Sequence, residues 1–120
     1  MKKVGLILLL LFSFNSYSQD VSCDDLLKFV KSEGSYESSI GVHTLNSDWL
    51  YEVTAYRYES KYYVIAKIKN NKYSYETKSY VFCGIPYRNW SDFKYGSYSD
   101  SKSYGERFHK YIIDYQCNCY

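Results

Sequence analysis

The N-terminal segment limits where this chain can fold, because it has the pattern of an export signal. A basic start is followed by an uncharged stretch with an apolar block over 4–14, which is typical of a secretory signal peptide. About eleven apolar residues are too few to cross a bilayer, which takes about twenty. We therefore expect a signal peptide over 1–18, cleaved after Ser18, and one domain over 19–120. The mature chain would then be periplasmic or extracellular, with no transmembrane segment.

Two alternatives to simple cleavage remain open at this end of the chain. The apolar block could stay attached as an N-terminal anchor. Alternatively, Cys23 could carry a lipid, although Asp20 stands where a lipoprotein site prefers an aliphatic residue. In each case about a hundred residues remain for folding, which is the size of one ordinary domain.

All the cysteines lie beyond the signal segment, and their even number predicts two disulfides in an exported chain of this size. They are Cys23, Cys83, Cys117 and Cys119. A bond between Cys117 and Cys119 would close a strained ring, so we expect each to pair with Cys23 or Cys83 in one of two arrangements. A four-thiolate zinc site is the alternative, but such sites usually bring their ligands in C-x₂₋₄-C pairs, and the chain has none.

The first half of the mature chain predicts a helix followed by strands. Apolar residues at helical spacing over 24–33 are followed by Gly34 as a stop signal. Apolar and polar residues then alternate over 51–55 and 62–68, which predicts a hairpin around Glu59-Ser60-Lys61. A third strand is expected within 73–85, most clearly at its end.

The second half predicts two helices that cover this sheet. One spans 87–95 behind Pro86, and the other spans 104–114, where Ser103 and Glu106 have the spacing of a capping box. Their apolar positions fall on one side of each helix. We therefore expect these side chains to be buried together against the sheet: Trp90, Phe93, Phe108 and Ile112. The order of elements predicts an α+β fold, a small antiparallel sheet of about three strands covered by short helices and stapled by disulfides.

Short motifs over roughly 38–113 resemble those of the KTSC domain, a small bacterial module that also occurs at the C-terminus of some lysyl-tRNA synthetases. They include Ser38-Ser39-Ile40, and the residues matching the family's motif are Tyr80, Phe82, Pro86, Ser103, Gly105 and Phe108. Phe82 stands where the family has a second Tyr. The resemblance implies a single KTSC-like α+β domain. RNA binding has been suggested for the family, but it suits an exported, disulfide-bonded chain poorly.

Charge gives no support for nucleic acid as a partner. The whole chain has 15 Lys and Arg against 13 Asp and Glu, and removal of Lys2 and Lys3 with the signal leaves equal numbers. Phosphate recognition depends on a basic stripe that releases counterions, and a neutral chain lacks that source of affinity. We therefore expect no nucleic-acid partner.

Tyrosine is the most unusual feature of the composition, with 17 in the chain. A tyrosine ring is rigid and apolar with a polar tip, so it suits surfaces that bind proteins or glycans. Tyrosines are also good strand formers that fill half-buried positions, which is the simpler explanation for any one of them. The candidate binding residues on strands are Tyr56, Tyr58, Tyr62, Tyr63 and Tyr80. The loop over 96–102 is a second candidate binding segment.

These observations predict a non-enzymatic binding module with a tyrosine-rich surface. The alternative is a small secreted hydrolase of the nuclease type, in which His43 and His109 act as acid and base. Lone histidines are more often surface residues than catalysts. The motifs for a nucleophilic serine, a phosphate-binding loop, a zinc protease and a dinucleotide site are all missing from the sequence. We expect no cofactor and no metal.

Overall fold

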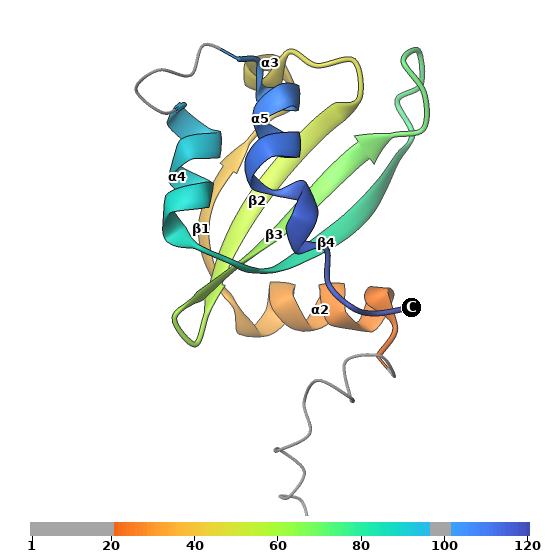
Figure 1. Cartoon of the computed structure of the whole chain (residues 1–120). Coiled ribbons are helices and arrows are strands. Elements are labelled where there is room, and N and C mark those ends of the chain that lie inside the picture. Colours follow the sequence, from red (N-terminus) through yellow and green to blue (C-terminus); the bar gives the residue numbers. More distant parts are fainter. Residues whose placement is uncertain (1–20, 97–101) are drawn as a thin grey trace, which may run out of the picture.

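The computed structural model describes residues 21–96 and 102–120, and it shows an α+β fold (Figure 1). The signal peptide expected over 1–18 lies outside the described residues, and so does most of the candidate binding loop over 96–102. Along the chain the elements are α2 (Cys23–Glu33), β1 (Ser35–Ile40), α3 (Val42–Leu45), β2 (Leu50–Tyr58), β3 (Lys61–Lys69), β4 (Thr77–Ile85), α4 (Tyr87–Tyr95), α5 (Tyr104–Tyr111) and the 3₁₀ helix η2 (Ile113–Tyr115).

The strands form one antiparallel sheet in the order β1-β2-β3-β4. The predicted hairpin is confirmed, since Tyr58 pairs with Lys61 across a turn of two residues. Both turn residues, Glu59 and Ser60, have positive φ angles of 51° and 67°. Positive φ at both central positions characterises the type I′ turn, whose twist matches that of the two strands it joins.

The sheet differs from the sequence prediction in its number of strands and in where one strand begins. The sheet has four strands, because Ser35–Ile40 pairs with β2 as an edge strand. β4 begins at Thr77, whereas the prediction placed the start of this strand at 73. Side chains hold the residues between as a turn: the Oδ1 atom of Asn71 accepts from the Tyr73 N–H at 2.9 Å, and the Ser74 hydroxyl accepts from the Glu76 N–H at 2.9 Å.

The front face of the sheet, which carries Val64 and Phe82, is covered by α4 and α5 (Figure 1). The predicted core is confirmed, because Trp90, Phe93, Phe108 and Ile112 are all buried there together. The Phe108 ring lies at the centre of this layer. Its centroid is 5.3 Å from that of Phe82, 5.9 Å from that of Phe93 and 5.6 Å from that of Trp49, with the rings edge to face.

The last helix begins as predicted but ends earlier. The Ser103 hydroxyl accepts from the Glu106 N–H at 3.2 Å and the Glu106 carboxylate accepts from the Ser103 N–H at 3.2 Å, so the capping box is present. The α-helix stops at Tyr111, whereas 114 was predicted. The chain then tightens into η2 and turns, so that Gln116 pairs with Phe82 of β4.

The back face of the sheet carries Ile65 and Val81, and α2 and the C-terminal tail cover one part of it. Val30 is the buried residue of α2 and packs against this pair. Figure 1 shows α2 at the lower end of the sheet, with the C-terminus beside it. No other helix of the described residues lies over the rest of the back face (Figure 1).

Two disulfides fasten this arrangement, as predicted. They join Cys23 to Cys119 and Cys83 to Cys117, with Cα separations of 5.1 Å and 5.0 Å. The backbone supports them, since the Cys117 N–H donates to the Val81 carbonyl at 3.2 Å and the Tyr120 N–H donates to the Val21 carbonyl at 3.1 Å. The tail therefore returns along β4 and ends against the start of α2. No helix within the described ranges is long and apolar enough to span a membrane.

Candidate functional site

The five tyrosines predicted as binding residues are divided between the two faces of the sheet. Tyr62 is buried on the front face, and Tyr80 packs half-buried against the same core. Tyr56 and Tyr63 pack half-buried on the back face, and Tyr58 lies beside Tyr63. Successive residues of a strand point to opposite faces, so Tyr62 and Tyr63 could never share a surface. Among these five tyrosines, Tyr56 lines a hollow on the back face.

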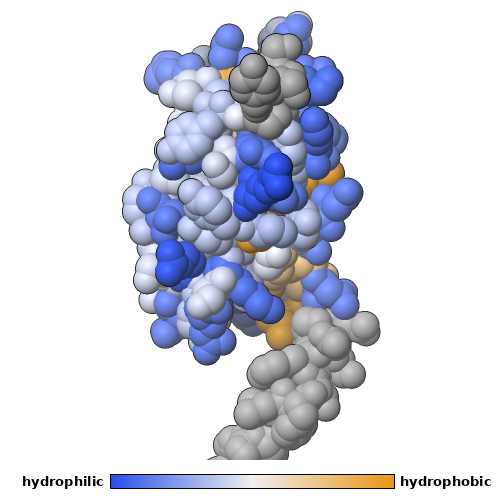
Figure 2. Space-filling model, turned by 60° about the vertical axis from the view of Figure 1, so that its left-hand side comes forward, coloured by the Kyte–Doolittle hydropathy of each residue, from blue (hydrophilic) through white to orange (hydrophobic). Residues whose placement is uncertain are grey.

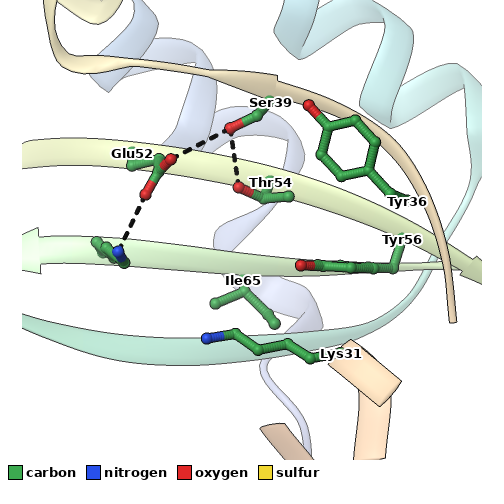
Figure 3. A pocket seen from close by; sticks show the side chains of 8 residues that line it. Lys31, Tyr36, Ser39, Glu52, Thr54, Tyr56 and Ile65 are labelled. Atoms are coloured by element: carbon green, nitrogen blue, oxygen red, sulfur yellow. Dashed lines mark hydrogen bonds and ion pairs between the residues drawn. The ribbon is translucent and has the colours of Figure 1, made fainter. Parts of the chain in front are cut away.

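That hollow, which we call the back groove, encloses about 290 Å³ on the uncovered part of the back face (Figure 3). It runs across β1, β2 and β3 and reaches the C-terminal end of α2. Its lining residues are Lys31, Tyr36, Ser39, Glu52, Thr54, Tyr56, Ile65 and Lys67. Figure 3 shows these side chains grouped around one opening, with tyrosines toward one end and the polar strand residues toward the other.

Tyr36 and Tyr56 form the aromatic side of the back groove. Their ring centroids are 6.2 Å apart with an interplanar angle of 81°. Tyr36 is 63% exposed, so most of its ring is available to a ligand, whereas Tyr56 is half-buried. The buried Ile65 provides an apolar surface between the strands. Tyr36 was not among the predicted binding residues, because the sequence around it gives no strand pattern.

The other side of the back groove is a connected set of polar side chains. The Glu52 carboxylate lies 3.2 Å from the Lys67 Nζ atom and accepts from the Ser39 hydroxyl at 3.5 Å. The Ser39 and Thr54 hydroxyl oxygens share a hydrogen bond of 2.9 Å. These groups restrain one another before any ligand arrives, which lowers the ordering cost of binding.

Lys31 completes the back groove from the last turn of α2. Figure 3 shows its side chain running along the hollow next to Ile65. No carboxylate within residues 21–96 and 102–120 forms an ion pair with it. The groove therefore has a cation at its edge and a neutralised Glu52–Lys67 pair inside.

A second aromatic group continues from the groove toward the β2–β3 turn. The Tyr58 ring lies 5.2 Å from that of Phe29 on α2 and 6.5 Å from that of Tyr63. Burial raises the pKa of the Tyr63 hydroxyl above its usual value of 10.0, and the nearby Glu59 and Tyr58 raise it further. The folded protein therefore favours the neutral phenol at this position.

A smaller hollow, which we call the front cleft, lies between β1 and α4. It encloses about 90 Å³ and is lined by Glu37, Tyr87, Trp90, Ser91, Lys94 and Tyr95. The Lys94 Nζ atom donates to the Ser38 hydroxyl at 3.3 Å, and the Tyr62 hydroxyl donates to the Glu37 carboxylate at 3.3 Å. Figure 2 turns the β1 and α4 side of the molecule forward and shows a mostly hydrophilic surface, with hydrophobic residues gathered low in the view.

The two histidines line different hollows. His43, on α3, lines a hollow with Tyr51 and Glu52, whereas His109 lines a hollow with Trp49 and Glu106. The His109 ring is 5.3 Å from that of Trp49. None of the hollows found in the described residues contains both histidines, although acid and base catalysts must reach the same substrate.

The residues that match the KTSC motif each have a structural role, either in the core or at the start of a helix. Phe82 and Phe108 belong to the front core, where Tyr80 is also packed, and Pro86 is the N-cap of α4. Ser103 caps α5, and a Cβ atom at Gly105 would lie 3.0 Å from the Trp49 Nε1 atom, so a larger residue there would press on the indole ring. These roles account for the motif without assigning it a ligand.

Within the described residues, no group of three or more His, Cys, Asp or Glu side chains is placed to hold a metal ion. The back groove is lined by aromatic rings, hydroxyls, Ile65, the Glu52–Lys67 ion pair and Lys31. Comparison of the chain with protein-family models, with curated proteins and with solved structures found no significant match.

Proposed function

We propose that this protein is an exported, non-enzymatic binding module that holds a protein or glycan partner in the back groove. The observation that supports the proposal best is the exposed Tyr36 ring, set against Tyr56 beside a restrained polar network. Binding sites commonly combine apolar surface with a few placed polar groups, and tyrosine adds contact area at a low cost in conformational entropy.

Export is part of the proposal and is supported by two observations. The N-terminal sequence has the pattern of a signal peptide, and all four cysteines are paired in disulfides. Disulfides persist in the periplasm and outside the cell and are rare in the cytosol. A binding module in such a compartment would meet envelope proteins and surface polysaccharides, which are the two partner classes proposed.

The test is affinity capture from the cell envelope and culture medium of the producing bacterium, with the oxidised protein immobilised. Tyr36→Ala removes the exposed ring of the groove, and Tyr73→Ala is the matched control. Tyr73 is 86% exposed on the β3–β4 loop and does not line the groove. We expect a partner that the wild type and Tyr73→Ala retain and that Tyr36→Ala loses. If all three proteins retained the partner equally, the back groove would be ruled out as its binding site. If none retained any partner, the binding function itself would be ruled out.

A further inference from the structure

The lining of the back groove is polar almost throughout. Ile65 is its only member with a wholly hydrocarbon side chain, and it is 4% exposed, so the groove offers a ligand little apolar surface. Protein interfaces draw most of their affinity from a few large side chains that fill well-packed, fully desolvated pockets. The lining therefore suits a ligand covered with hydroxyl groups better than a segment of polypeptide.

Two hydroxyls and a carboxylate form a row across β1 and β2 inside the groove (Figure 3). Ser39 and Thr54 share one hydrogen bond, and Glu52 accepts from Ser39. Each hydroxyl oxygen has two lone pairs and the carboxylate has about four, so all three groups keep the capacity to accept from a ligand. Neighbouring hydroxyls on a sugar ring can donate to this row together.

Tyr36 and Tyr56 form a corner at the other end of the groove. Their rings are nearly perpendicular, at 81°, with centroids 6.2 Å apart, and Tyr36 is 63% exposed. The negative face of an aromatic ring attracts C–H groups, which cover the faces of a pyranose ring. A sugar lying on Tyr36 would therefore meet the second ring at its edge, while its hydroxyls stay free for the polar row.

One charge in the groove is left without a partner. The Glu52 carboxylate lies 3.2 Å from the Lys67 Nζ atom, and the two charges cancel. Lys31 forms no ion pair within residues 21–96 and 102–120, and it approaches the hollow from α2, beside Ile65 and across from β1 (Figure 3). The lining has two lysines and one glutamate, so a carboxylate on a ligand that lies across the groove would neutralise the excess positive charge.

The dimensions of the groove suit a short stretch of a polymer. β2 separates β1 from β3, and neighbouring strands lie about 4.8 Å apart, so the outer two are roughly 10 Å from each other. The volume of about 290 Å³ is close to the lower limit of the roughly 300–1,000 Å³ that small-ligand sites enclose. Two linked sugar rings would span this distance, one on Tyr36 and the next beside Ile65 on the Lys31 side.

We propose that the back groove binds a polysaccharide that contains uronic acids, with Tyr36 stacked on one sugar ring and Lys31 paired with a carboxylate of the chain. This inference rests on the proposed binding function and names the class of partner. An acidic polypeptide would also meet the unpaired lysine, but it lacks the adjacent hydroxyls that the acceptor row matches.

The first experiment measures the affinity of the oxidised protein for soluble polysaccharides by affinity electrophoresis. The probes are polygalacturonate, alginate and hyaluronate, each as the free acid and as the neutral methyl ester of the same chain. At least one free acid should bind roughly 1.5- to 5-fold more tightly than its ester, which is the effect of one exposed ion pair. Equal affinity for acid and ester, or no binding to any of these polymers, would overturn the inference.

Variants test the two residues that would hold the sugar. Tyr36→Ala should weaken binding roughly 5- to 30-fold, as expected when a central aromatic anchor is lost. Lys31→Gln should weaken binding to the free acid roughly 1.5- to 5-fold and leave any binding to the ester unchanged. Lys28→Gln is the matched control, because Lys28 is exposed on the same helix and does not line the groove. An equal loss from Lys28→Gln would indicate diffuse attraction to a polyanion and would also overturn the inference.

Affinity capture from the cell envelope separates this inference from the proposed function. Recovery of a uronic-acid polymer that Tyr36→Ala loses would support both. Recovery of a Tyr36-dependent protein in its place would overturn the inference, yet the proposed binding function would stand.

Discussion

The two faces of the sheet are built on different principles. The front face is sealed by α4 and α5, and its interior is a set of aromatic rings in edge-to-face contact around Phe108. The back face has a small apolar cluster around Val30 and depends on two disulfides to keep α2 and the tail in place. Packing of the front face makes the fold, and covalent links on the back face hold α2 and the tail while the back groove stays open.

Removal of either disulfide should have the largest effect on stability, and it tests the difference between the two faces. The Cys23–Cys119 bond spans 96 residues of sequence and the Cys83–Cys117 bond spans 34. In the chain-entropy description, loops of these lengths correspond to about 4.7 and 3.8 kcal/mol of stability. Cys23→Ser with Cys119→Ser should therefore lower the free energy of unfolding more than Cys83→Ser with Cys117→Ser. Urea denaturation measures both, and hydrogen exchange should show α2 opening before α4 and α5. Simultaneous opening of all three helices would contradict the division between the faces.

The next test removes the centre of the front face. Phe108 is fully buried and contacts three other aromatic rings, so Phe108→Ala should cost about 3–5 kcal/mol. Thermal unfolding of the oxidised protein measures the loss. Phe29→Ala is the control, because Phe29 is an aromatic residue of the back face that is 44% exposed. A Phe108→Ala protein that melts at the wild-type temperature would show that the ring layer is not the core.

A matched pair of valines compares the faces directly. Val64 is buried on the front face and Val81 on the back face, in neighbouring strands. Truncation of either to alanine removes the same atoms, at about 1–3 kcal/mol when transfer and cavity terms are combined. The Val64→Ala cost should be the larger, since aromatic rings fixed on several sides cannot collapse into the cavity. Equal costs from chemical denaturation would mean that the back cluster is packed as rigidly as the front.

The smallest expected effect is a loss of stability at alkaline pH, caused by ionisation of Tyr63 on the back face. The folded-state pKa of Tyr63 is raised above 10.0 by burial, so the folded protein favours the neutral phenol. Its contribution to stability is fully present below the unfolded-state pKa and is lost as the pH rises through the folded-state pKa. Tyr63→Phe should therefore lose less stability than the wild type between pH 9 and about pH 11. Urea midpoints across this range measure it, and parallel curves for the two proteins would refute the assignment.

The starts of the two late helices, the stop of the first helix and the core residues could be predicted because their signals are local. The N-cap at Ser103, the stop at Gly34 and the start after Pro86 each act within one turn, and the helical spacing of Trp90 and Phe93 reports which side is buried. The turn at Glu59 and Ser60 was found from the two alternating runs on either side of it.

The candidate binding surface could be predicted only in part, because the apolar and polar residues of an edge strand need not alternate. β1 has Ile40 as its only buried residue, so its sequence resembles a loop, and Tyr36 was missed with it. The tyrosines on β2 and β3 were identified from the sequence. The face of the sheet on which each ring lies depends on the strand register, which the sequence alone did not provide. Tyr62 belongs to the core and Tyr56 to the groove, and this division requires the pairing of the strands to be known.

The pairing of the cysteines has a consequence for how the chain is made. The two bonds are nested, because Cys83–Cys117 lies inside the span of Cys23–Cys119. A ribosome synthesises Cys23 and Cys83 long before either of their native partners. The earliest bond open to the growing chain is therefore a wrong one. Correct assembly requires either oxidation that waits for the last few residues or an exchange catalyst that reshuffles an early Cys23–Cys83 link, and uncatalysed exchange takes minutes to hours. Yield of the native protein should thus depend on disulfide isomerase activity rather than on oxidising power alone.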